Sequence, residues 1–440
     1  MTKTAIAGGA FAAVIVLLAI AMSYVALEPI LNPATPPAIT RATAAAEARP
    51  SFLYGRITVR NGTTYEGRLR WGRDQEAFWG DYFNGSRKEN TWAAKVPPEL
   101  LRKQPRPVRI FGFEIGRQED PVDLARQFMA RFGDIARIEM LDGDVRVTLK
   151  SGTMFDLDYS SATDFGDSVR VWDSKHGVMD LDPGQVETIE LLPSPGEGTV
   201  PLRLHGTVHT QHRDFTGFIQ WDRNKGVGTD ELKGGTADGD ISLRFYTIRS
   251  IERQSASSSS VSLFDGRRIV LSGTREAGDG NLGMYVDDRR YGRVLITWDA
   301  FERVDFSAGG SGPAYGDFPA GRPLTGSVTK RDGRHLAGRL VYDLDESETT
   351  ETLDVASQGV EYTIPFGMIA SIKLPGGDDR ARVTLHDGET LQFEHNGDLG
   401  KGNAGLLIFV DGRERPEYVL WSDVEQISLD RPPRMYPPQK

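Results

Sequence analysis

The chain has no cysteine among its 440 residues. It therefore has no disulfide scaffold, no thiolate zinc or iron–sulfur site, no cysteine nucleophile and no lipid-modified N-terminal cysteine. Positive charge is also scarce, because 52 Lys and Arg stand against 62 Asp and Glu, a formal net charge of −10. Nucleic-acid partners are held by clustered Lys and Arg, so we expect no nucleic acid among the partners.

Long apolar runs are missing as well, with one exception at the N-terminus. Residues 4–27 are almost unbroken apolar chain, and a Pro- and Ala-rich linker follows at 29–50. Such a stretch is long enough for the ~30 Å hydrocarbon core of a bilayer, whereas a cleaved signal has an apolar core of ~7–15 residues. We expect residues 1–28 to be a signal anchor in the inner membrane, with the body of the chain outside the cytoplasm. The alternative is a cleaved signal peptide and a periplasmic protein, for which Ala19-Ile20-Ala21 is a suitable site.

Glycine is abundant, with 49 residues, and there are 24 prolines and many short apolar stretches. This composition is typical of a turn-rich β protein. Six segments end in the same way, with an aromatic residue or Pro and then two apolar residues at three-residue steps. They are Phe132–Ile138, Pro183–Ile189, Phe245–Ile251, Trp298–Val304, Phe366–Ile372 and Trp421–Ile427. The three-residue step predicts a single helical turn that leads into a last strand.

A predicted β-hairpin opens each of the six segments. An apolar residue lies four positions ahead of a two-residue turn, and the residues around the turn alternate between apolar and polar, as in strands with one buried face. The turns are at 61–62, 151–152, 212–213, 265–266, 332–333 and 387–388. Most are Asn-Gly or Asp-Gly, which tolerate the positive φ of tight hairpin turns. The turn His212-Arg213 has no Gly.

The order of these features resembles the SH3-like or Sm-like small β-barrel. It consists of a strand, an Asn-Gly or Asp-Gly turn, a second strand with Gly then Leu, and a closing apolar strand. Residues 57–69 carry the likeness most clearly, through Asn61-Gly62 and Gly67-Arg68-Leu69. The resemblance implies an all-β fold of six tandem small barrels, as in bacterial envelope proteins. The RNA-binding residues of the second Sm motif have no counterpart in this chain. A six-bladed β-propeller is the competing architecture.

The repeated positions also predict where the units begin and end. Odd units continue as Gly-x-aliphatic-x-aromatic and even units carry Gly-rich loops, so the six units form three pairs. Their ranges are 52–140 with an insertion at 84–129, then 141–192, 201–254, 258–307, 322–375 and 379–430. The serine-rich stretch 255–260 and the Gly- and Pro-rich stretch 307–322 are predicted connectors. Inside the insertion, Asp120-Pro121 predicts a short helix with Leu124 and Phe128 on one face.

Few residues are arranged as catalytic or ligand-binding motifs, and no catalytic residue, metal ligand or cofactor is predicted. The string Gly278-Asp-Gly-Asn-Leu-Gly283 matches a dinucleotide-binding motif. That motif needs a following helix, and a strand-like sequence follows here, so we expect a loop. His205 and His209 are four apart on a predicted strand, about 13 Å, which is too far to share one zinc ion.

Paired acids leave a second function open. Two carboxylates flank a Leu at Asp156 and Asp158, at Asp180 and Asp182, and at Asp343 and Asp345. Alternation along a strand places both acids of a pair on one side, which explains them without catalysis. Glycosidases, however, use two acids ~5–9.5 Å apart. A hydrolase that acts on polysaccharide or peptidoglycan is therefore the alternative function.

Aromatic side chains gather in the first unit. They are Trp71, Phe78, Trp79, Tyr82, Phe83 and Trp92. Exposed aromatic residues stack on sugars or anchor a partner protein, whereas buried ones would fill a core enlarged by the insertion. The leading function is a non-enzymatic, membrane-tethered binding or scaffold protein outside the cytoplasm that contacts an envelope protein or a glycan. These six aromatic residues are its candidate contact residues.

Overall fold

The computed structural model describes residues 51–72, 75–101, 106–110, 113–118, 127–141, 143–158, 168–195, 202–310, 312–374, 376 and 380–433. Within them the protein is all-β, as predicted, and the only α-helix is the four-residue α3 (Pro98–Leu101). The predicted anchor and linker, 1–28 and 29–50, lie outside the described residues. A helix with the length and apolar character to cross a membrane is not found in the part of the chain that is described.

The first sheet has eight antiparallel strands in the order β11-β10-β2-β1-β12-β7-β8-β9. Their bounds are β1 (Tyr54–Val59), β2 (Thr64–Trp71), β7 (Ile135–Met140), β8 (Asp144–Leu149), β9 (Met154–Asp158), β10 (Val169–Asp173), β11 (Gly177–Leu181) and β12 (Val186–Leu191). Beside β9 lies the two-stranded sheet of β3 (Tyr82–Ser86) and β6 (Gln127–Arg131), linked to it by a bridge between Arg87 and Leu157. A separate hairpin joins β4 (Arg106–Ile110) and β5 (Phe113–Gln118).

The second sheet has twelve strands in the order β16-β15-β19-β18-β17-β22-β13-β14-β20-β21-β26-β25. Their bounds are β13 (His205–Thr210), β14 (Asp214–Gln220), β15 (Glu231–Thr236), β16 (Gly239–Arg244), β17 (Ile248–Ser255), β18 (Ser258–Leu263), β19 (Arg268–Ser272), β20 (Met284–Asp288), β21 (Gly292–Ile296), β22 (Phe301–Phe306), β25 (Thr352–Ser357) and β26 (Val360–Pro365). The predicted serine-rich connector 255–260 is therefore wrong, because these residues form the β17–β18 hairpin.

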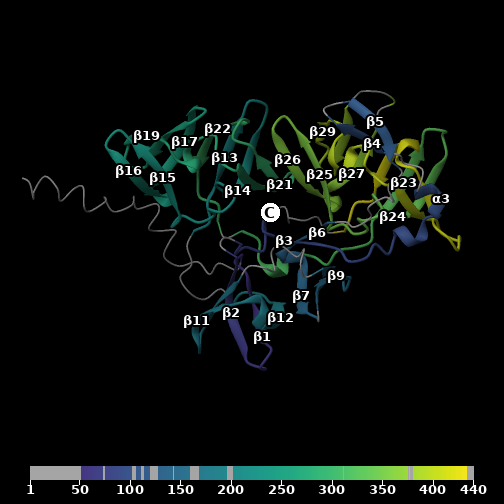
Figure 1. Ribbon diagram of the computed structural model, residues 1–440, viewed down its shortest axis with the longest axis horizontal. Coiled ribbons are helices and arrows are strands. Elements are labelled where there is room, and N and C mark those ends of the chain that lie inside the picture. The colour runs from purple at the N-terminus through teal and green to yellow at the C-terminus, as the bar shows by residue number, and fades with distance from the viewer. Residues whose placement is uncertain are drawn as a thin grey trace, which may run out of the picture.

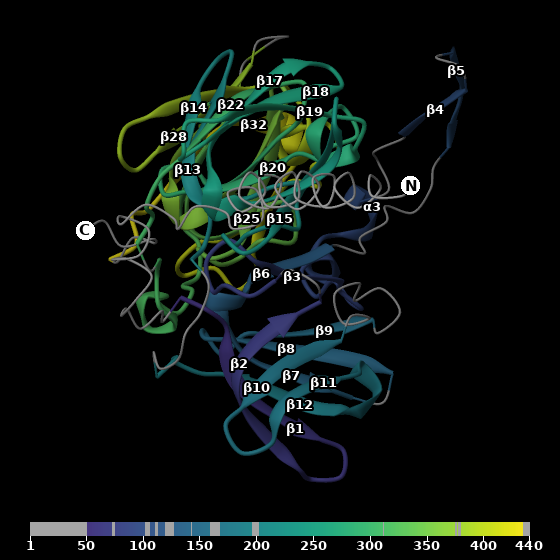
Figure 2. The same ribbon diagram turned by 90° about the vertical axis from the view of Figure 1, so that its left-hand side faces the viewer.

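The third sheet has eight strands in the order β29-β28-β27-β32-β23-β24-β30-β31. Their bounds are β23 (Thr325–Lys330), β24 (His335–Val341), β27 (Ile369–Lys373), β28 (Ala381–Leu385), β29 (Thr390–Phe393), β30 (Leu406–Phe409), β31 (Glu417–Val419) and β32 (Val424–Leu429). The pairing of β21 with β26 joins the second sheet to strands from the third predicted pair of units. Figures 1 and 2 show the first sheet on its own below the other two, which lie side by side.

Local structure follows the sequence closely. All six predicted hairpins are present, as β1–β2, β8–β9, β13–β14, β18–β19, β23–β24 and β28–β29. Five of the six predicted endings are a 3-10 turn that leads into a closing strand: η2 (Phe132–Asp134), η4 (Pro183–Gln185), η5 (Phe245–Thr247), η8 (Phe366–Met368) and η10 (Trp421–Asp423). The sixth, at 298–300, is a hydrogen-bonded turn before β22. The other 3-10 turns in the described part of the chain are η1 (Ala93–Lys95), η6 (Arg275–Ala277), η7 (Tyr315–Asp317) and η9 (Gly397–Leu399).

A set of five neighbouring strands recurs through the molecule, and we call it a module. In the second sheet one module is β22-β13-β14-β20-β21 and the other is β17-β18-β19-β15-β16. Each places a closing strand beside an opening hairpin, then a third and a fourth strand. The two modules meet where β17 pairs with β22. The corresponding modules are β12-β1-β2-β10-β11 and β7-β8-β9-β3-β6 around the first sheet, and β32-β23-β24-β30-β31 and β27-β28-β29-β25-β26 around the third, where β9 contacts β3 and β29 contacts β25.

Each module is assembled by exchange of strands between predicted units. The hairpin β13–β14 falls in the range 201–254, whereas its neighbours β20, β21 and β22 fall in 258–307. Each predicted unit thus supplies strands to two modules. No described sheet closes into a barrel in its hydrogen-bonded order. The expectation of closed barrels is corrected accordingly, because fourth strands such as β16 lie at an edge of their sheet instead of pairing back on it.

Paired glycines allow the closing strand and the third strand to approach the opening hairpin. Gly206 lies opposite Gly217 across the β13–β14 hairpin. A Cβ on Gly206 would lie 2.3 Å from the carbonyl oxygen of Asp305, and one on Gly217 would lie 2.1 Å from that of Asp287. The same pairing occurs at Gly55 and Gly67 and at Gly326 and Gly338. Only glycine fits such an approach.

Two large cores hold these sheets. One continuous cluster of buried apolar residues runs through the second and third sheets, and a second fills the first sheet. The predicted connector 307–322 belongs partly to the latter, because Tyr315 and Phe318 are buried there and the Tyr315 hydroxyl donates to the carbonyl of Ile135 at 2.8 Å. The predicted helix at Asp120-Pro121 lies outside the described residues, and Phe128, expected on its face, lies in strand β6.

Candidate functional site

The strongest candidate site is a pocket of ≈ 380 Å³ between the two-stranded sheet β3–β6 and strand β25 of the second sheet, which we call the junction pocket. One wall comes from β3, β6 and the residue after β3, and the other from β25 and the acid-rich loop before it. The lining residues are Asn84, Gly85, Ser86, Arg87, Gln127, Phe128, Met129, Glu346, Glu351, Thr352 and Asp354. Its residues therefore come from the first and fifth predicted units.

Arg87 dominates the charge balance of the junction pocket. Its Nη1 lies 2.5 Å from Asp345 Oδ1, and its Nη2 lies 2.7 Å from Glu351 Oε1. The guanidinium also lies 4.4 Å from the ring centroid of Phe155, and only 9% of the side chain is exposed. Desolvation offsets much of the Coulomb attraction of a buried ion pair, but removing one partner leaves an uncompensated buried charge and is strongly destabilising. Arg87 thus fixes two acids in place.

Glu351 also accepts hydrogen bonds within its own loop. Its Oε2 accepts hydrogen bonds from the backbone amides of Ser347 at 2.5 Å and Glu348 at 2.9 Å. In the first sheet Asp81 does the same, because its Oδ2 accepts from the amides of Glu76 and Ala77 at 2.9 Å. A carboxylate that closes its own loop in this way is held in one orientation. Glu351 is therefore a poor candidate for proton transfer.

Glu346 and Asp354 are the acids of the pocket that hold a proton most readily. Burial raises the pKa of Asp354 to about 6, against hydrogen bonds from Thr363 and Thr352 that lower it. Burial and the neighbouring Asp345 raise the pKa of Glu346 well above its usual value. Perturbed acids beside a pocket are a common feature of active sites, although structural clusters also produce them. These two residues are the candidates for any acid–base chemistry here.

A second buried polar cluster joins the first and second sheets. Asp81 accepts a hydrogen bond from the Gln220 side chain and lies 3.7 Å from Arg293 Nη2. Asp287 lies 3.4 Å from Arg203 Nη2 and 3.7 Å from Arg293 Nε, and burial raises its pKa to about 6. These groups are enclosed, so they bind the two sheets to each other and offer no access to a ligand.

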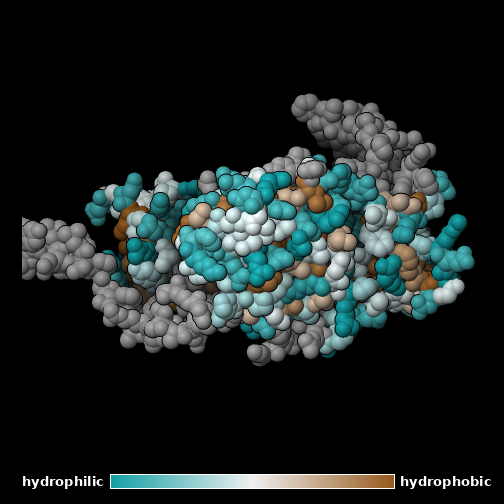
Figure 3. All heavy atoms as spheres, turned by 90° about the horizontal axis from the view of Figure 1, so that it is seen from below, coloured by the Kyte–Doolittle hydropathy of each residue, from teal (hydrophilic) through white to brown (hydrophobic). Residues whose placement is uncertain are grey.

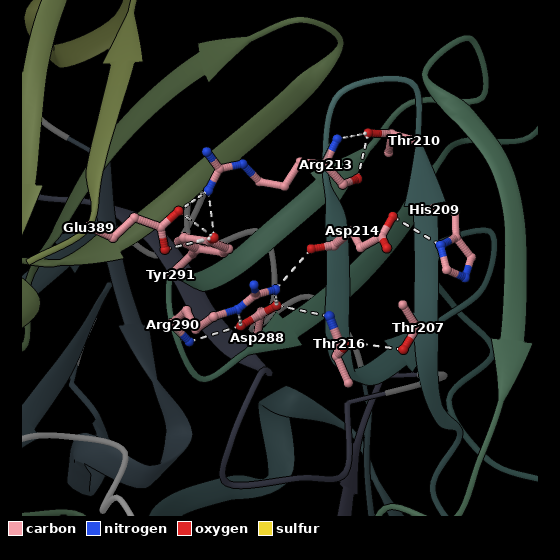
Figure 4. Close-up of polar contacts among 10 residues, drawn as sticks. All are labelled: Thr207, His209, Thr210, Arg213, Asp214, Thr216, Asp288, Arg290, Tyr291 and Glu389. Atoms are coloured by element: carbon pink, nitrogen blue, oxygen red, sulfur yellow. Dashed lines mark hydrogen bonds and ion pairs between the residues drawn. The ribbon is translucent and has the colours of Figure 1, made fainter. Parts of the chain in front are cut away.

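The second and third sheets meet at a further cluster, shown in Figure 4. Arg213, in the hairpin turn that lacks Gly, forms an ion pair with Glu389 in the turn after β28. The Tyr291 hydroxyl donates to Glu389 Oε1 at 2.8 Å. The turn itself is closed by Thr210, whose Oγ1 accepts from the Arg213 amide at 3.1 Å and donates to its carbonyl at 2.7 Å. This side chain explains how the hairpin forms without glycine.

An open polar groove of ≈ 920 Å³ surrounds His209 on the second sheet. His209 Nδ1 lies 2.9 Å from Asp214 Oδ1, and Nε2 lies 3.3 Å from Asp305 Oδ2. Both ring nitrogens thus have carboxylate partners; Figure 4 shows the contact with Asp214. His205 and His212 do not join this arrangement. Among the described residues, no group of three His, Asp or Glu side chains is arranged to hold a metal ion.

Five of the six predicted contact residues are buried. Trp71, Phe78 and Phe83 have no exposed surface, and Trp79 and Tyr82 are 2% exposed. They pack in and around the core of the first sheet and cannot present a surface to a ligand, so the prediction of a contact role is corrected to a packing role. The aromatic cluster is therefore the enlarged core that the sequence also allowed.

Trp92 has a different environment. It lies in the segment 87–101, which we call the strap, and this segment crosses from β3 to the third sheet. Its ring is 6.0 Å from that of Phe409 in an edge-on contact. Just before it, the Asn90 side chain donates to the carbonyl of Leu344 at 3.0 Å. The strap, which begins the predicted insertion, thus docks the first sheet on the third.

The acid pairs found in the sequence have structural partners. Asp156 and Asp180 form ion pairs with Arg146 and Arg170 across neighbouring strands. Asp345 pairs with Arg87, and Asp343 accepts from the backbone amide of Ala404. The loop at 278–283 has no helix after it, as expected, and Asn281 closes it by accepting from the amide of Gly283 at 2.8 Å.

Sequence reasoning missed Arg87, Glu346, Glu351 and Asp354 as a group. Part of the signal was visible, because residues 343–351 include Asp343, Asp345, Glu346, Glu348 and Glu351. Comparison with family models, with curated proteins and with solved structures finds no match for this chain. No relative therefore lends a function to the junction pocket, and its role rests on its own geometry.

Proposed function

We propose that the protein is a non-enzymatic binding or scaffold protein outside the cytoplasm, tethered to the inner membrane through residues 4–27, and that it contacts an envelope protein or a glycan. The observation that carries this proposal is the use of charge at the sheet junctions. Arg87, just after β3, pairs with Glu351 in the loop from β24 of the third sheet to β25 of the second. Arg293 of the second sheet lies beside Asp81, just before β3, and Arg213 and Glu389 join the second and third sheets.

Charges used in this way support a rigid body with a broad surface. An acid that is ion-paired or accepts from backbone amides is held in one orientation and is stabilised as the anion. Such an acid is a poor general acid. Three sheets held by such contacts keep their loops and edges in fixed positions, which lowers the entropic cost of binding a partner.

The first sheet is the part of this body that we propose for contact with the partner. It projects from the other two sheets in Figures 1 and 2. The two most exposed large apolar side chains among the described residues both belong to it: Met154 on β9 is 60% exposed and Val178 on β11 is 57% exposed. The face seen from below in Figure 3 is mostly hydrophilic, with separate hydrophobic areas.

We also propose that each module is a small unit of the SH3-like or Sm-like type, and that the chain is a tandem array of three pairs. Support comes from the position of the closing strand beside the opening hairpin in all six modules. The recurrent Gly pairs, such as Gly206 with Gly217, support the same proposal.

Site-specific photocrosslinking in intact cells tests the proposed contact. A photoreactive amino acid replaces Val178 or Met154 in the full chain, and Val270 on β19 of the second sheet, which is 48% exposed, provides a matched control. We expect a discrete crosslinked product with an envelope protein, or retention on isolated envelope glycan, from the first-sheet positions only. Equal products from Val270, or none from Val178 and Met154, would refute the proposed surface.

One observation favours the alternative, a hydrolase that acts on polysaccharide or peptidoglycan. Burial gives Asp354 a pKa of about 6 beside a pocket of ≈ 380 Å³, and the pKa of Glu346 is also raised. A protonated acid near neutral pH is what glycoside cleavage requires of its general acid. This alternative predicts that Asp354→Asn keeps the fold and abolishes the release of soluble glycan fragments.

A further inference from the structure

The edge strand β16 has a counterpart elsewhere in the chain that is not an edge. Hairpins β15–β16 and β25–β26 each have two six-residue strands. Each turns through two residues, 237–238 and 358–359. Each is then followed by a 3-10 turn that begins with Phe, at Phe245 and Phe366, and by a closing strand. The two strands β16 and β26 therefore occupy the same position in their modules.

Their outer edges differ. The outer edge of β26 pairs with β21, with Thr363 opposite Arg293 and Glu361 opposite Leu295. Among the described residues β16 pairs with β15 alone, on its inner edge. Within the part of the chain that is described, then, the fourth strand of one such module has an antiparallel neighbour on its outer edge and the fourth strand of the other does not.

The register of the hairpin shows which groups of β16 face outward. Thr236 and Gly239 flank the two-residue turn, and such a flanking pair is hydrogen-bonded in hairpins of this kind. Hydrogen-bonded positions then alternate along the strand. Ile241 and Leu243 bond to β15, whereas Asp240, Ser242 and Arg244 direct their backbone N–H and C=O groups outward. These correspond to Glu361 and Thr363 of β26, which face β21.

Another fourth strand is protected against edge pairing. Strand β31 has three residues and follows Pro416, which has no N–H to donate. Short strands and proline are standard means of blocking an edge. Strand β16 has six residues and no proline, so neither of these means blocks its edge against an antiparallel partner.

We propose that β16 pairs with β16 of a second copy of this chain, antiparallel, across a two-fold axis at Ser242. This register places Asp240 opposite Arg244 of the partner subunit, and the reverse pair forms at the other side of the axis. On the opposite face it places Ile241 opposite Leu243 of the partner subunit. Opposite charges and apolar pairs directly across two strands each stabilise a sheet.

The charges on β16 select the second copy over other occupants. Asp240 and Arg244 are exposed, and they lie symmetrically about Ser242. An isologous contact needs such self-complementarity, because residue i meets residue j on both subunits. A single strand edge makes a contact well below the ~1,600 Å² of a standard interface, so the dimer is reversible and depends on concentration.

Charge reversal on the full chain tests the proposal. The oligomeric state is measured by sedimentation over a range of concentrations in mild detergent. Asp240→Arg and Arg244→Asp each place like charges across the axis, and we expect each to weaken dimerisation about tenfold or more. The double variant D240R/R244D restores opposite charges and should restore the dimer, which a misfolded chain would not do. A monomeric wild type, or single variants that dimerise as well as the wild type, would overturn the proposal.

Engineered cysteine tests the register, and the absence of natural cysteine makes the result unambiguous. In the proposed dimer Ser242→Cys faces its own copy, with Cα atoms ~5.5 Å apart, within the range that a disulfide bridges. Mild oxidation should give a covalent dimer of S242C and none of the control D238C at the hairpin tip. Crosslinking of D238C at the level of S242C would show random collision and overturn the register. Asp180→Arg on the edge strand β11 should leave the dimer intact; its loss there would assign dimerisation to the first sheet instead.

Discussion

Arg87 Nη2, just after β3, lies 2.7 Å from Glu351 Oε1, just before β25 of the second sheet. The same guanidinium lies 2.5 Å from Asp345 Oδ1. One cation from the predicted insertion therefore balances two acids of a distant segment. The acid-rich loop can be buried because that cation is present.

Replacing Arg87 with Met should destabilise the protein strongly. The change leaves Asp345 and Glu351 without their buried counter-charge, so we expect the free energy of unfolding to fall by about 3 kcal/mol. Urea unfolding at neutral pH measures it. Arg146→Met, which removes an exposed ion pair with Asp156, is the matched control and should change little. A loss for Arg87→Met no larger than for this control would contradict the structural role of Arg87.

The raised pKa of Asp354 predicts that the stability of the protein depends on pH. Burial raises its pKa in the folded protein to about 6, above its usual value of 3.8. The folded state keeps the proton while the unfolded chain releases it, so this group lowers stability as pH rises from about 4 to about 7. Asp354→Asn cannot ionise. Its melting temperature relative to wild type should therefore rise between pH 4.5 and pH 7, and a difference that is constant with pH would refute the raised pKa.

The paired glycines make a steric prediction. A methyl group on Gly217 would lie 2.1 Å from the backbone oxygen of Asp287, so β14 and β20 would have to separate. We expect Gly217→Ala to cost about 2 kcal/mol or more in the free energy of unfolding. Gly184→Ala is the control, since nothing lies within 4 Å of the added methyl. Equal stability of the two variants would show that the close approach is absent.

Trp71 and Trp92 should respond differently to truncation. Trp71 is fully buried, so Trp71→Ala should cost about 3–5 kcal/mol. Trp92 is only partly buried, against Phe409. Trp92→Ala should leave most of the stability intact but speed amide hydrogen exchange in the strap, because that segment loses its contact with the third sheet. Unchanged exchange in residues 87–101 would mean that Trp92 does not anchor the strap.

Local features could be predicted from the sequence, and nonlocal ones could not. Asn61-Gly62 predicts its hairpin because the turn needs positive φ, and Gly62 indeed has a φ of +85°. Strand β14 pairs with β20 rather than with β15, the next strand in the sequence. The alternation of apolar and polar residues cannot predict which of the two strands pairs with β14, because both alternate in the same way. The exchange of strands between units therefore could not be predicted from the sequence. Nor could the finding that the sheets do not close into barrels.

In the candidate site, too, local features could be predicted from the sequence and nonlocal contacts could not. The acids near Glu346 are visible in the sequence as a cluster, but Arg87, which balances them, is far away in the chain. The aromatic residues around Trp79 were visible too, yet composition cannot distinguish a buried ring from an exposed one. Burial in the first sheet decides that question, and it leaves Met154 and Val178 as the exposed apolar candidates.

The central claim is that this protein binds its target and does not cut it. The most direct measurement incubates the full chain with isolated peptidoglycan and envelope polysaccharide and quantifies soluble fragments, for wild type and for the variants Glu346→Gln and Asp354→Asn. We predict that wild type releases no more than buffer does and that both variants behave identically to it. Release by wild type that is lost in Asp354→Asn, with the fold retained, would contradict the account and identify the junction pocket as an active site.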